Sequence, residues 1–348
     1  MRRHTFWIGV CAATALITAA GEETVPKESS LRLEVDLVDG SRLIGVPAIA
    51  TVPVQTSYAK MDVPLAQIQS LKIGDDHETA TLDLRNGDKL SGVLRLSVIE
   101  LTALFGKTAI GLEHVKRLLV YREVELPPSI RKGLVLHYSF DKDEGARAVD
   151  RSEKENNGAI HGATRTVKGR MGSAYEFDGV DDRIEVTYDA SLFPGEAFTL
   201  CAWIYRRDAG TACNIISATY NNPPDRYLYL LNASADGKLG LHSYEGGPLY
   251  RAESEPALAA DRWHFVCGTF DAGADSKNAK VYVDGRLLGT ADHRAPLRGY
   301  DGPLNIGCYQ NRAGGARYRD HFKGILDDVM IWDRALSEAE VRQLYEAL

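Results

Sequence analysis

One stretch of this sequence occurs twice without gaps. Residues 35–46 align with residues 82–93, at an offset of 47 residues. In both copies apolar and polar residues alternate on either side of a turn-forming pair, Asp39-Gly40 in the first and Asn86-Gly87 in the second. Asp-Gly and Asn-Gly pairs favour two-residue hairpin turns. We therefore expect each copy to form several short strands that cannot bury a hydrophobic face alone. Together the two copies could close a small β-barrel or pack as paired sheets.

The repeat defines a predicted N-terminal domain over residues 31–123. Its isolated histidines, His77 and His114, have no partners that would suggest catalysis, so we interpret them as structural and expect an adaptor or interaction role. Pro127 and Pro128 follow, and a double proline interrupts a strand ladder or a helix. The domain boundary is therefore predicted near residues 124–132.

Residues 1–20 have the features of a secretory signal peptide. Arg2 and Arg3 precede an apolar segment at residues 7–20 that ends in small residues, and an acidic pair follows. A membrane-spanning helix needs roughly 20 apolar residues, so this segment is too short for a span. The sequence predicts a secreted or extracytoplasmic protein (periplasm, cell surface or extracellular space) without a transmembrane span beyond the signal segment. An uncleaved N-terminal anchor is the alternative.

The charge of the chain limits the classes of partner it can bind, and its cysteine content bears on the cellular compartment. The chain has 348 residues, with 41 Lys and Arg against 48 Asp and Glu, so its formal net charge is −7. Basic residues are interspersed with acidic ones rather than clustered, which argues against a nucleic-acid partner. Four of the five cysteines lie after position 200, and export would permit disulfides among them.

From Gly133 onward, strand signals recur at short intervals. Alternating or apolar runs are separated by turn-forming pairs such as Asp236-Gly237 and Asp284-Gly285. Many short strands with this turn chemistry predict an antiparallel sandwich or jelly roll. Near the C-terminus, Ser337 and Glu340 form a capping-box pattern before an apolar stripe, which predicts one short helix.

Several motifs of this region resemble the laminin-G-like (LamG-like, concanavalin A-like) family, with features of pentraxin domains. They are Tyr-Ser-Phe-Asp at 138–141, Phe-Asp-Gly at 177–179, Phe-Thr-Leu-Cys at 198–201, Trp-His at 263–264, Val-Tyr-Val-Asp-Gly at 281–285, and the run from 324 to 337. The resemblance implies an all-β fold, with a jelly-roll sandwich over residues 133–348 preceded by the tandem-repeat domain.

The pentraxin likeness also implies a disulfide. Cys201 and Cys267 lie in strands that match the disulfide-bonded strands of pentraxins, so we expect them to form a clamp across the sandwich. Two buried thiols are the alternative, because cysteine packs well as a small hydrophobic residue. The resemblance assigns no partner to Cys213 or Cys308.

The resemblance further implies Ca²⁺ as a candidate cofactor, structural or bridging to a ligand, with oxygen ligands. Matched to the pentraxin calcium loops, the candidate ligands are Asp225, Gln310, Asn311 and Asp320. Tyr309 occupies a position where an acid is expected, so we expect a single weak site at most. A second candidate is a structural ion near Asp178, Asp181, Asp182 and Asp327, although plain turn chemistry is the favoured explanation for the first three.

Glycan recognition is expected at aromatic and planar polar side chains on the loop rims. The candidates are Tyr220, Asn221, Asn222, Tyr309 and Arg312. The Glu-x-Asp-x-x-Glu pattern of related hydrolases does not occur in this sequence. We therefore expect a secreted, non-enzymatic binding or adhesion protein whose jelly roll recognises a glycan or an extracellular protein, with Ca²⁺ as a candidate aid. The alternatives are a carbohydrate-active enzyme with two carboxylates in one cleft, or a structural envelope protein.

Overall fold

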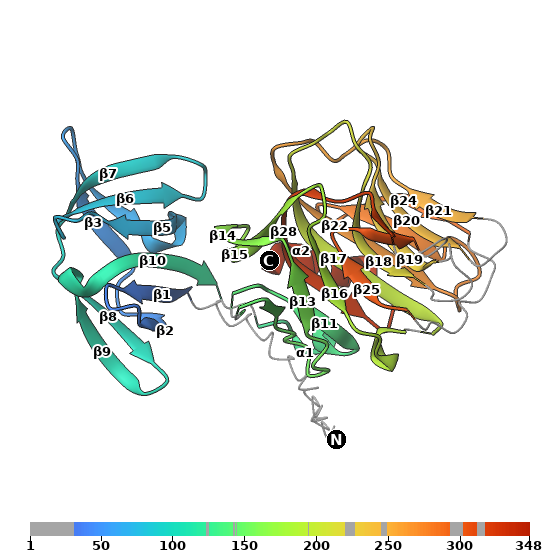
Figure 1. Ribbon diagram of the computed structural model, residues 1–348, viewed down its shortest axis with the longest axis horizontal. Helices are drawn as coiled ribbons and strands as arrows, with labels where there is room; N and C mark the ends of the chain where they lie inside the picture. The colour runs from blue at the N-terminus through green and yellow to red at the C-terminus, as the bar shows by residue number, and fades with distance from the viewer. Residues whose placement is uncertain are drawn as a thin grey trace, which may run out of the picture.

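The computed structural model describes residues 31–122, 125–141, 143, 145–193, 195–219, 227–244, 249–292, 302–311 and 317–348. They form two bodies of β-structure with separate hydrophobic cores (Figure 1). The predicted all-β fold with one short C-terminal helix is confirmed.

The N-terminal domain contains the same series of elements twice. The first series is β1 (Leu31–Leu37), β2 (Arg42–Pro47), β3 (Thr51–Gln55), β4 (Lys60–Pro64), the 3₁₀ turn η1 (Leu65–Gln67) and β5 (Ile68–Ile73). The second is β6 (Thr79–Leu84), β7 (Lys89–Leu94), β8 (Val98–Ala103), β9 (Gly106–Gly111), η2 (Leu112–His114) and β10 (Val115–Arg122). The turns after β1 and β6 each use a glycine in the left-handed region, Gly40 at φ 87° and Gly87 at φ 92°.

The two series exchange strands. The sheet order is β4-β3-β7-β6-β5-β10-β1-β2-β8-β9, so β3 pairs with β7 and β2 pairs with β8. The path has two ends, at β4 and β9, and within residues 31–122 it is not closed into a barrel. Each series therefore completes the sheet of the other, and the shared core includes Leu33, Leu82 and Leu118.

The segment between the domains is packed rather than extended. The double proline is expected to interrupt a preceding strand or helix, and Pro128 begins the new short helix α1 (Pro128–Arg131). Proline is tolerated at this position because the first N–H groups of a helix have no intrahelical partner. Ile130 is fully buried, and its carbonyl accepts a hydrogen bond of 2.6 Å from Trp332 Nε1. The connection is thereby attached to the C-terminal domain.

The C-terminal domain is a sandwich of two sheets. Sheet I has the order β14-β15-β28-β17-β22-β23-β24, with β11 also paired to β28. Its strands are β11 (Leu134–Tyr138), β14 (Thr164–Gly169), β15 (Gly172–Asp178), β17 (Ala197–Arg206), β22 (Trp263–Asp271), β23 (Ala279–Val283), β24 (Arg286–Ala291) and β28 (Lys323–Trp332).

Sheet II has the order β12-β13-β16-β25-β18-β19-β20-β21. Its strands are β12 (Arg147–Ala148), β13 (Gly158–His161), β16 (Arg183–Val186), β25 (Leu304–Ile306), β18 (Cys213–Thr219), β19 (Tyr227–Ala233), β20 (Leu239–Tyr244) and β21 (Leu249–Glu253). The 3₁₀ turn η3 (Ala190–Leu192) precedes β17, and a hairpin of β26 (Tyr309–Asn311) and β27 (Arg317–Arg319) follows β25.

The main core lies between sheets I and II. Alternate residues of β17 such as Leu200 and Ile204 point inward with Ile216 and Ile306 of sheet II, and all four are fully buried. Each such side chain contributes about 1.5–3 kcal/mol of hydrophobic free energy. The period-two pattern therefore fixes which residues of each strand are left for the outer faces.

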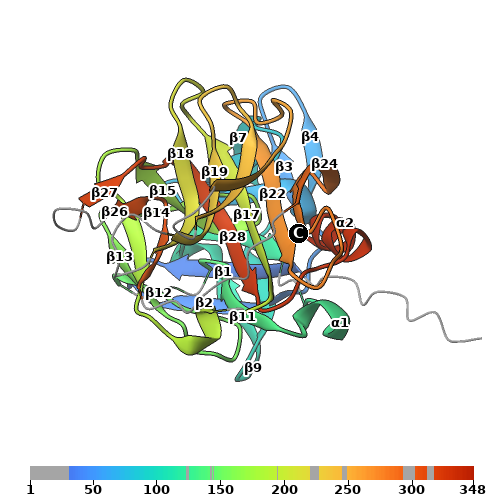
Figure 2. The ribbon, with the colours of Figure 1, turned by 90° about the vertical axis from the view of Figure 1, so that its right-hand side faces the viewer.

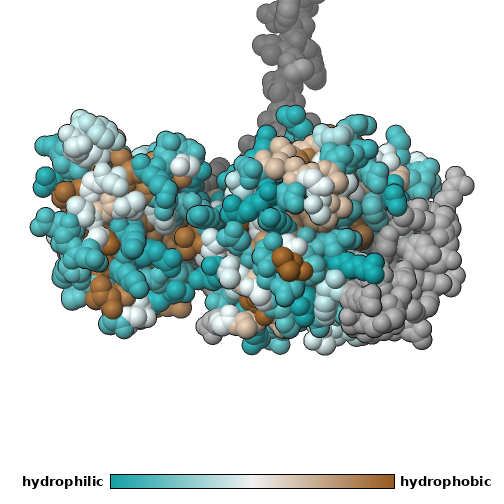
Figure 3. Space-filling model, turned by 45° about the horizontal axis from the view of Figure 1, so that its top comes forward, coloured by the Kyte–Doolittle hydropathy of each residue, from teal (hydrophilic) through white to brown (hydrophobic). Residues whose placement is uncertain are grey.

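Helix α2 (Glu338–Ala347) covers the outer face of sheet I, beside β22 and β24 (Figure 2). The predicted capping box is present, with the Ser337 hydroxyl and the Glu340 carboxylate each bonded to the other's backbone N–H. Val341 and Leu344 pack there in a second apolar cluster with Trp203 and Phe265. On the molecular face seen in Figure 3, hydrophobic side chains form small separate groups rather than one large patch.

Candidate functional site

The predicted cysteine pair lies within one sheet. Cys201 of β17 is directly opposite Cys267 of β22, and both are fully buried beneath α2. The expected clamp across the sandwich is therefore wrong, because both strands belong to sheet I. The structure has the two residues as free thiols with their Sγ atoms 2.8 Å apart, which is longer than the roughly 2.05 Å of a disulfide. A bond between these neighbours stays a prediction.

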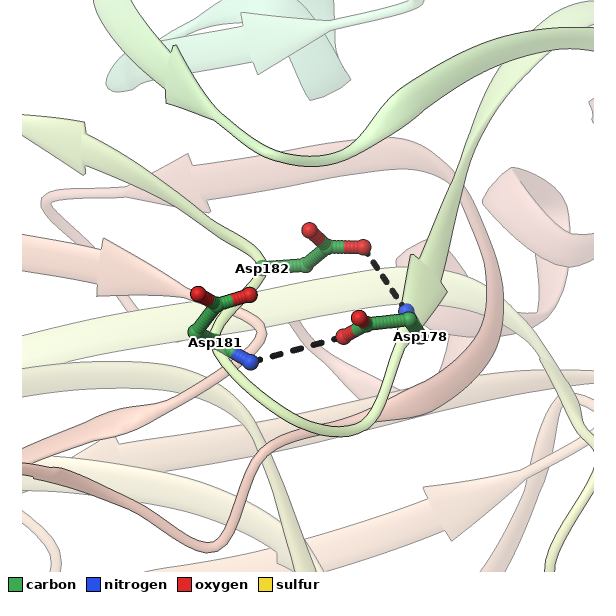
Figure 4. Close-up of side chains that lie close together, drawn as sticks. All are labelled: Asp178, Asp181 and Asp182. Carbon is green, nitrogen blue, oxygen red and sulfur yellow. Dashed lines mark hydrogen bonds between the residues drawn. The ribbon is translucent and has the colours of Figure 1, made fainter.

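Three of the predicted metal ligands meet in the turn after β15. The carboxylates of Asp178, Asp181 and Asp182 approach one another within 4.8 Å (Figure 4). Asp178 accepts hydrogen bonds from the Val180 and Asp181 backbone, and these bonds lower its pKa. Asp182 accepts from the Asp178 N–H at 2.8 Å. These contacts are turn chemistry, which provides partners for the Asp178 and Asp182 carboxylates without an ion.

Asp327 does not join that turn, contrary to the expected grouping. Asp178 pairs with Lys323 at the start of β28, whereas Asp327 lies four residues further along, on the order of 13 Å away. Asp327 instead belongs to an acidic trio with Asp328 and Asp141. Asp328 has φ 44° and sits at a register shift in β28, where the strand carries one extra residue opposite β17.

The acidic trio is buried at the junction of β11, β28 and the β14–β15 turn. Burial raises the pKa of Asp327 well above its usual value, and the neighbouring Asp328 and Asp141 add to the effect. Burial likewise raises the pKa of Asp141 to about 8. Asp327 accepts bonds from the Met171 and Asp328 N–H groups, and Asp328 Oδ1 lies 3.1 Å from His137 Nε2. Such carboxylates need a proton or a cation, and their oxygen atoms suit a hard cation such as Ca²⁺.

A second polar group lies on the outer face of sheet II. Because Ile184 and Ile306 point into the core, the alternate residues Arg183, Glu185 and Asn305 face outward. The hairpin β26–β27 brings Gln310 and Tyr318 against them. We call these five residues the outer-face cluster.

The outer-face cluster is closely interconnected. The Tyr318 hydroxyl donates to Glu185 Oε2 at 2.6 Å and accepts from Gln310 Nε2 at 3.1 Å. The Arg183 guanidinium lies over the Tyr318 ring, 4.0 Å from its centre. Asn305 is fully buried between Glu185 and Ser217 in the strand register, and within the described chain neither of its amide atoms has a hydrogen-bond partner.

The structure brings one of the sequence-predicted calcium ligands, Gln310, into this cluster. Asp320 is exposed, and its backbone carbonyl accepts a hydrogen bond of 2.9 Å from the Asn214 N–H. Tyr309 is half-buried in β26, and Asn311 ends that strand. Predicted residues outside the described parts of the chain, or with undescribed side chains, are Tyr220, Asn221, Asn222, Asp225, Asn311 and Arg312.

Sequence reasoning missed Tyr318, Glu185 and Asn305. Glu185 and Asn305 each lie between two core residues of a short strand, so the period-two pattern could have placed them on the outer face. Tyr318 gave no such signal, because its position depends on how the β26–β27 hairpin folds back over the sheet. No helix in the described parts of the chain is both long and apolar enough to cross a membrane.

Comparison with known proteins places this domain among lectin-like folds. Residues 178–342 match the family model described as the Concanavalin A-like lectin/glucanases superfamily, a laminin-G model. The pentraxin-related protein PTX3 of Mus musculus is 29% identical over 156 residues, which cover 42% of this chain and 38% of that protein. Pentraxin-4 of Homo sapiens is 28% identical over 154 residues, 42% of this chain and 31% of that protein. The match thus spans less than two fifths of either relative.

Two solved structures with a similar arrangement are complexes of binding or accessory domains. One is domain 4 of AbnA, a GH43 extracellular arabinanase from Geobacillus stearothermophilus, in complex with arabinotriose. It is 18% identical with a TM-score of 0.47 and covers 61% of this chain and 98% of that chain. The other is the binding domain of botulinum neurotoxin DC in complex with SialylT, 13% identical with a TM-score of 0.47, over 63% of this chain and 52% of that one.

Proposed function

The C-terminal domain of this chain is a laminin-G-like jelly roll, and from this premise we propose that the protein is an extracytoplasmic, non-enzymatic lectin. The outer-face cluster of sheet II is the proposed binding site. Its ligand would be a glycan, held by planar polar groups and one aromatic ring, with Ca²⁺ as a candidate aid.

The unpartnered amide of Asn305 is the observation that carries this proposal. A buried amide without hydrogen bonds is costly, so it calls for a partner, and an ordered water or a bound ligand next to it can supply one. Beside it stand a carboxylate, a second amide and a tyrosine, which together offer donors and acceptors in fixed planes. Sugar hydroxyls both donate and accept, so this combination suits a glycan.

The spacing of acids on the same face argues against glycoside hydrolysis there. The described side chains of the sheet II strands include two acidic residues, Glu185 on β16 and Glu253 on β21. These strands are five positions apart in the sheet order, about 24 Å at 4.8 Å per strand. A glycosidase needs two carboxylates about 5–10 Å apart. A binding role therefore suits these strands better than a hydrolytic one.

A glycan array probed with Tyr318→Ala against the wild type tests the proposal, with and without a chelator. Tyr58→Ala is the matched control, because Tyr58 is 77% exposed in the N-terminal domain. We expect glycans bound by the wild type to lose about tenfold or more in affinity in Tyr318→Ala, since two hydrogen bonds of the site are removed. Tyr58→Ala should bind as the wild type does. Absence of glycan binding in both conditions, or equal loss in both variants, would refute the proposal.

A further inference from the structure

A cleft of about 610 Å³ lies between the two domains. One wall is formed by β5, β6 and the β6–β7 turn of the N-terminal domain. The other is formed by the β14–β15 turn and the adjoining ends of β17 and β22. In Figure 1, β14 and β15 lie on the side of the sandwich that faces β5 and β10. Clefts of this size at domain interfaces are common ligand sites.

Direct hydrogen bonds hold the two walls together. Gln69 Nε2 donates to the Gly169 carbonyl at 3.0 Å, and Arg85 Nη1 donates to the Arg170 carbonyl at 3.4 Å. The same Arg85 also donates to Val120 O at 2.6 Å within its own domain. These hydrogen bonds fix the two walls relative to each other, so the cleft has a defined shape.

The cleft is positively charged, although the protein is acidic. Its lining includes six cationic residues and three aspartates, a formal charge of 6 − 3 = +3, whereas the whole chain carries −7. The cationic residues are Arg85, Lys89, Lys168, Arg170, Arg207 and Arg262. A concentration of one sign of charge in a cleft raises the local concentration of the opposite ion.

Within the described parts of the chain, Lys168 and Arg170 have no acidic partner. Lys89 is paired with Asp83 at 3.1 Å, and Arg207 is paired with Glu176 at 2.9 Å. In contrast, no described carboxylate lies within 4.0 Å of Lys168 or Arg170. The Arg170 guanidinium is instead held over the Trp203 ring, 4.6 Å from its centre. Both positive charges therefore remain available to an anionic group.

Aromatic side chains line the same cleft. Tyr205 of β17 and Trp263 of β22 are directly opposite in the strand register, and their rings meet edge to face with centroids 5.7 Å apart. Both are only partly buried, unlike Trp203 and Trp332. An aromatic surface beside cations matches a ligand with apolar ring faces and negative substituents.

We propose that the interdomain cleft binds an acidic polysaccharide. Its sugar rings pack against Trp263 and Tyr205, and its carboxylate or sulfate groups pair with Lys168 and Arg170. This site is separate from the outer-face cluster, so the two can fail independently.

Calorimetry on the full chain tests the proposal with four probes: polygalacturonate, dextran sulfate, neutral dextran and polyphosphate. The first two distinguish carboxylate from sulfate recognition, and the last two separate sugar from charge. Lys168→Glu should weaken binding of the acidic polysaccharide about tenfold, because an attraction becomes a repulsion. Asn86→Asp, which keeps the hairpin turn but adds an acid to the opposite wall, should weaken it several-fold. Lys116→Glu, an exposed lysine outside the cleft, is the matched control.

A Trp263→Phe and Trp263→Ala pair tests the aromatic contact. We expect polysaccharide affinity to fall in the alanine variant and to be largely retained in the phenylalanine variant, with polyphosphate binding unaffected by either. Thermal melts identify any variant that has lost its fold, and Tyr318→Ala should leave binding in the cleft unchanged. The proposal is overturned if neither acidic polysaccharide binds, if Lys116→Glu is as harmful as Lys168→Glu, or if polyphosphate binds more tightly than both.

Discussion

Burial alters the ionisation of single side chains on the outer face of sheet II. His242 of β20 is only 9% exposed, and burial lowers its pKa from 6.5 to about 4, with the nearby Arg251 acting in the same direction. Glu253, whose Oε1 lies 3.4 Å from His242 Nε2, opposes this shift. The folded protein therefore holds His242 neutral where the unfolded chain would protonate it.

This difference between the folded and unfolded states makes stability depend on pH in a defined window. Because the pKa of His242 is lower in the folded state, its contribution is complete above pH 6.5 and is lost as the pH falls toward 4. The loss amounts to roughly 3 kcal/mol at most, because a tenfold change in proton affinity corresponds to about 1.4 kcal/mol. We expect His242→Gln to reduce the acid sensitivity of the unfolding free energy in denaturant titrations between pH 7 and 4.5.

His161→Gln is the matched control, because His161 is exposed on β13 of the same sheet. Its unfolding free energy should follow the wild type across the whole range. If the His242 and His161 variants have the same pH profile as the wild type, burial of His242 does not destabilise the protein in acid.

A cation at the acidic trio is the second expectation at this scale. Asp327 is 1% exposed and lies beside two further carboxylates, so a bound cation would relieve their repulsion. We expect millimolar Ca²⁺ to raise the melting temperature of the wild type by several degrees, because a ligand that binds only the folded state stabilises it. Asp327→Asn should lose this response in thermal melts.

Asp178→Asn separates the two candidate ion sites. Asp178 lies in the turn after β15, where its Oδ1 already accepts hydrogen bonds from the Val180 and Asp181 backbone N–H groups. The variant should keep the Ca²⁺ response that Asp327→Asn loses. A response that disappears with Asp178 and persists without Asp327 would assign the ion to the turn instead.

At the scale of elements, strand register decides which predicted contacts form. Cys201 and Cys267 occupy opposed positions of β17 and β22, where a bond would link two neighbouring strands under α2. We expect protein purified under oxidising conditions to gain the mass of two hydrogens on reduction after denaturation, and this gain to be absent in Cys201→Ser. Cys213→Ser is the matched control and should keep it. An unchanged mass in the wild type would establish two buried thiols.

The sequence is sufficient to predict where the strands lie, but not which strands pair with one another. Period-two alternation and Asp-Gly turns located β17, β22 and β23, and the capping box at Ser337 located α2. Those patterns are local, and each is repeated within a few residues. Which strands become neighbours depends on contacts far apart in the chain, so local patterns do not reveal that the strands of Cys201 and Cys267 both lie in sheet I.

The candidate sites were less predictable for the same reason. Asp327 was identifiable as unusual, because an acid within an apolar strand must find a partner. Its partners Asp141 and Asp328 were not, since they depend on an irregularity in β28 and on the end of β11. Tyr318 reaches its partners only when the β26–β27 hairpin folds over sheet II. Trp263 lines a cleft only when the two domains meet.

At the scale of the whole molecule, polar contacts of named side chains join the two domains. Arg85 is central among them, because its guanidinium bonds to Ala66 and Val120 in the N-terminal domain and to Arg170 in the other. Glu34 and Arg165 add an ion pair at 3.8 Å across the same interface. Interfaces of this polar kind permit relative motion unless specific contacts prevent it.

Arg85→Ala should therefore loosen the domains without unfolding either one. It removes the hydrogen bonds to Ala66, Val120 and Arg170, while Leu126 and Ile130 keep the connecting segment packed on the sandwich. We expect small-angle X-ray scattering to show a larger radius of gyration and a broader distance distribution than the wild type, with unchanged circular dichroism. Arg95→Ala, an exposed arginine of the same domain, is the control and should scatter as the wild type does. If Arg85→Ala scatters as the wild type does, the remaining contacts are sufficient to hold the two domains together without Arg85.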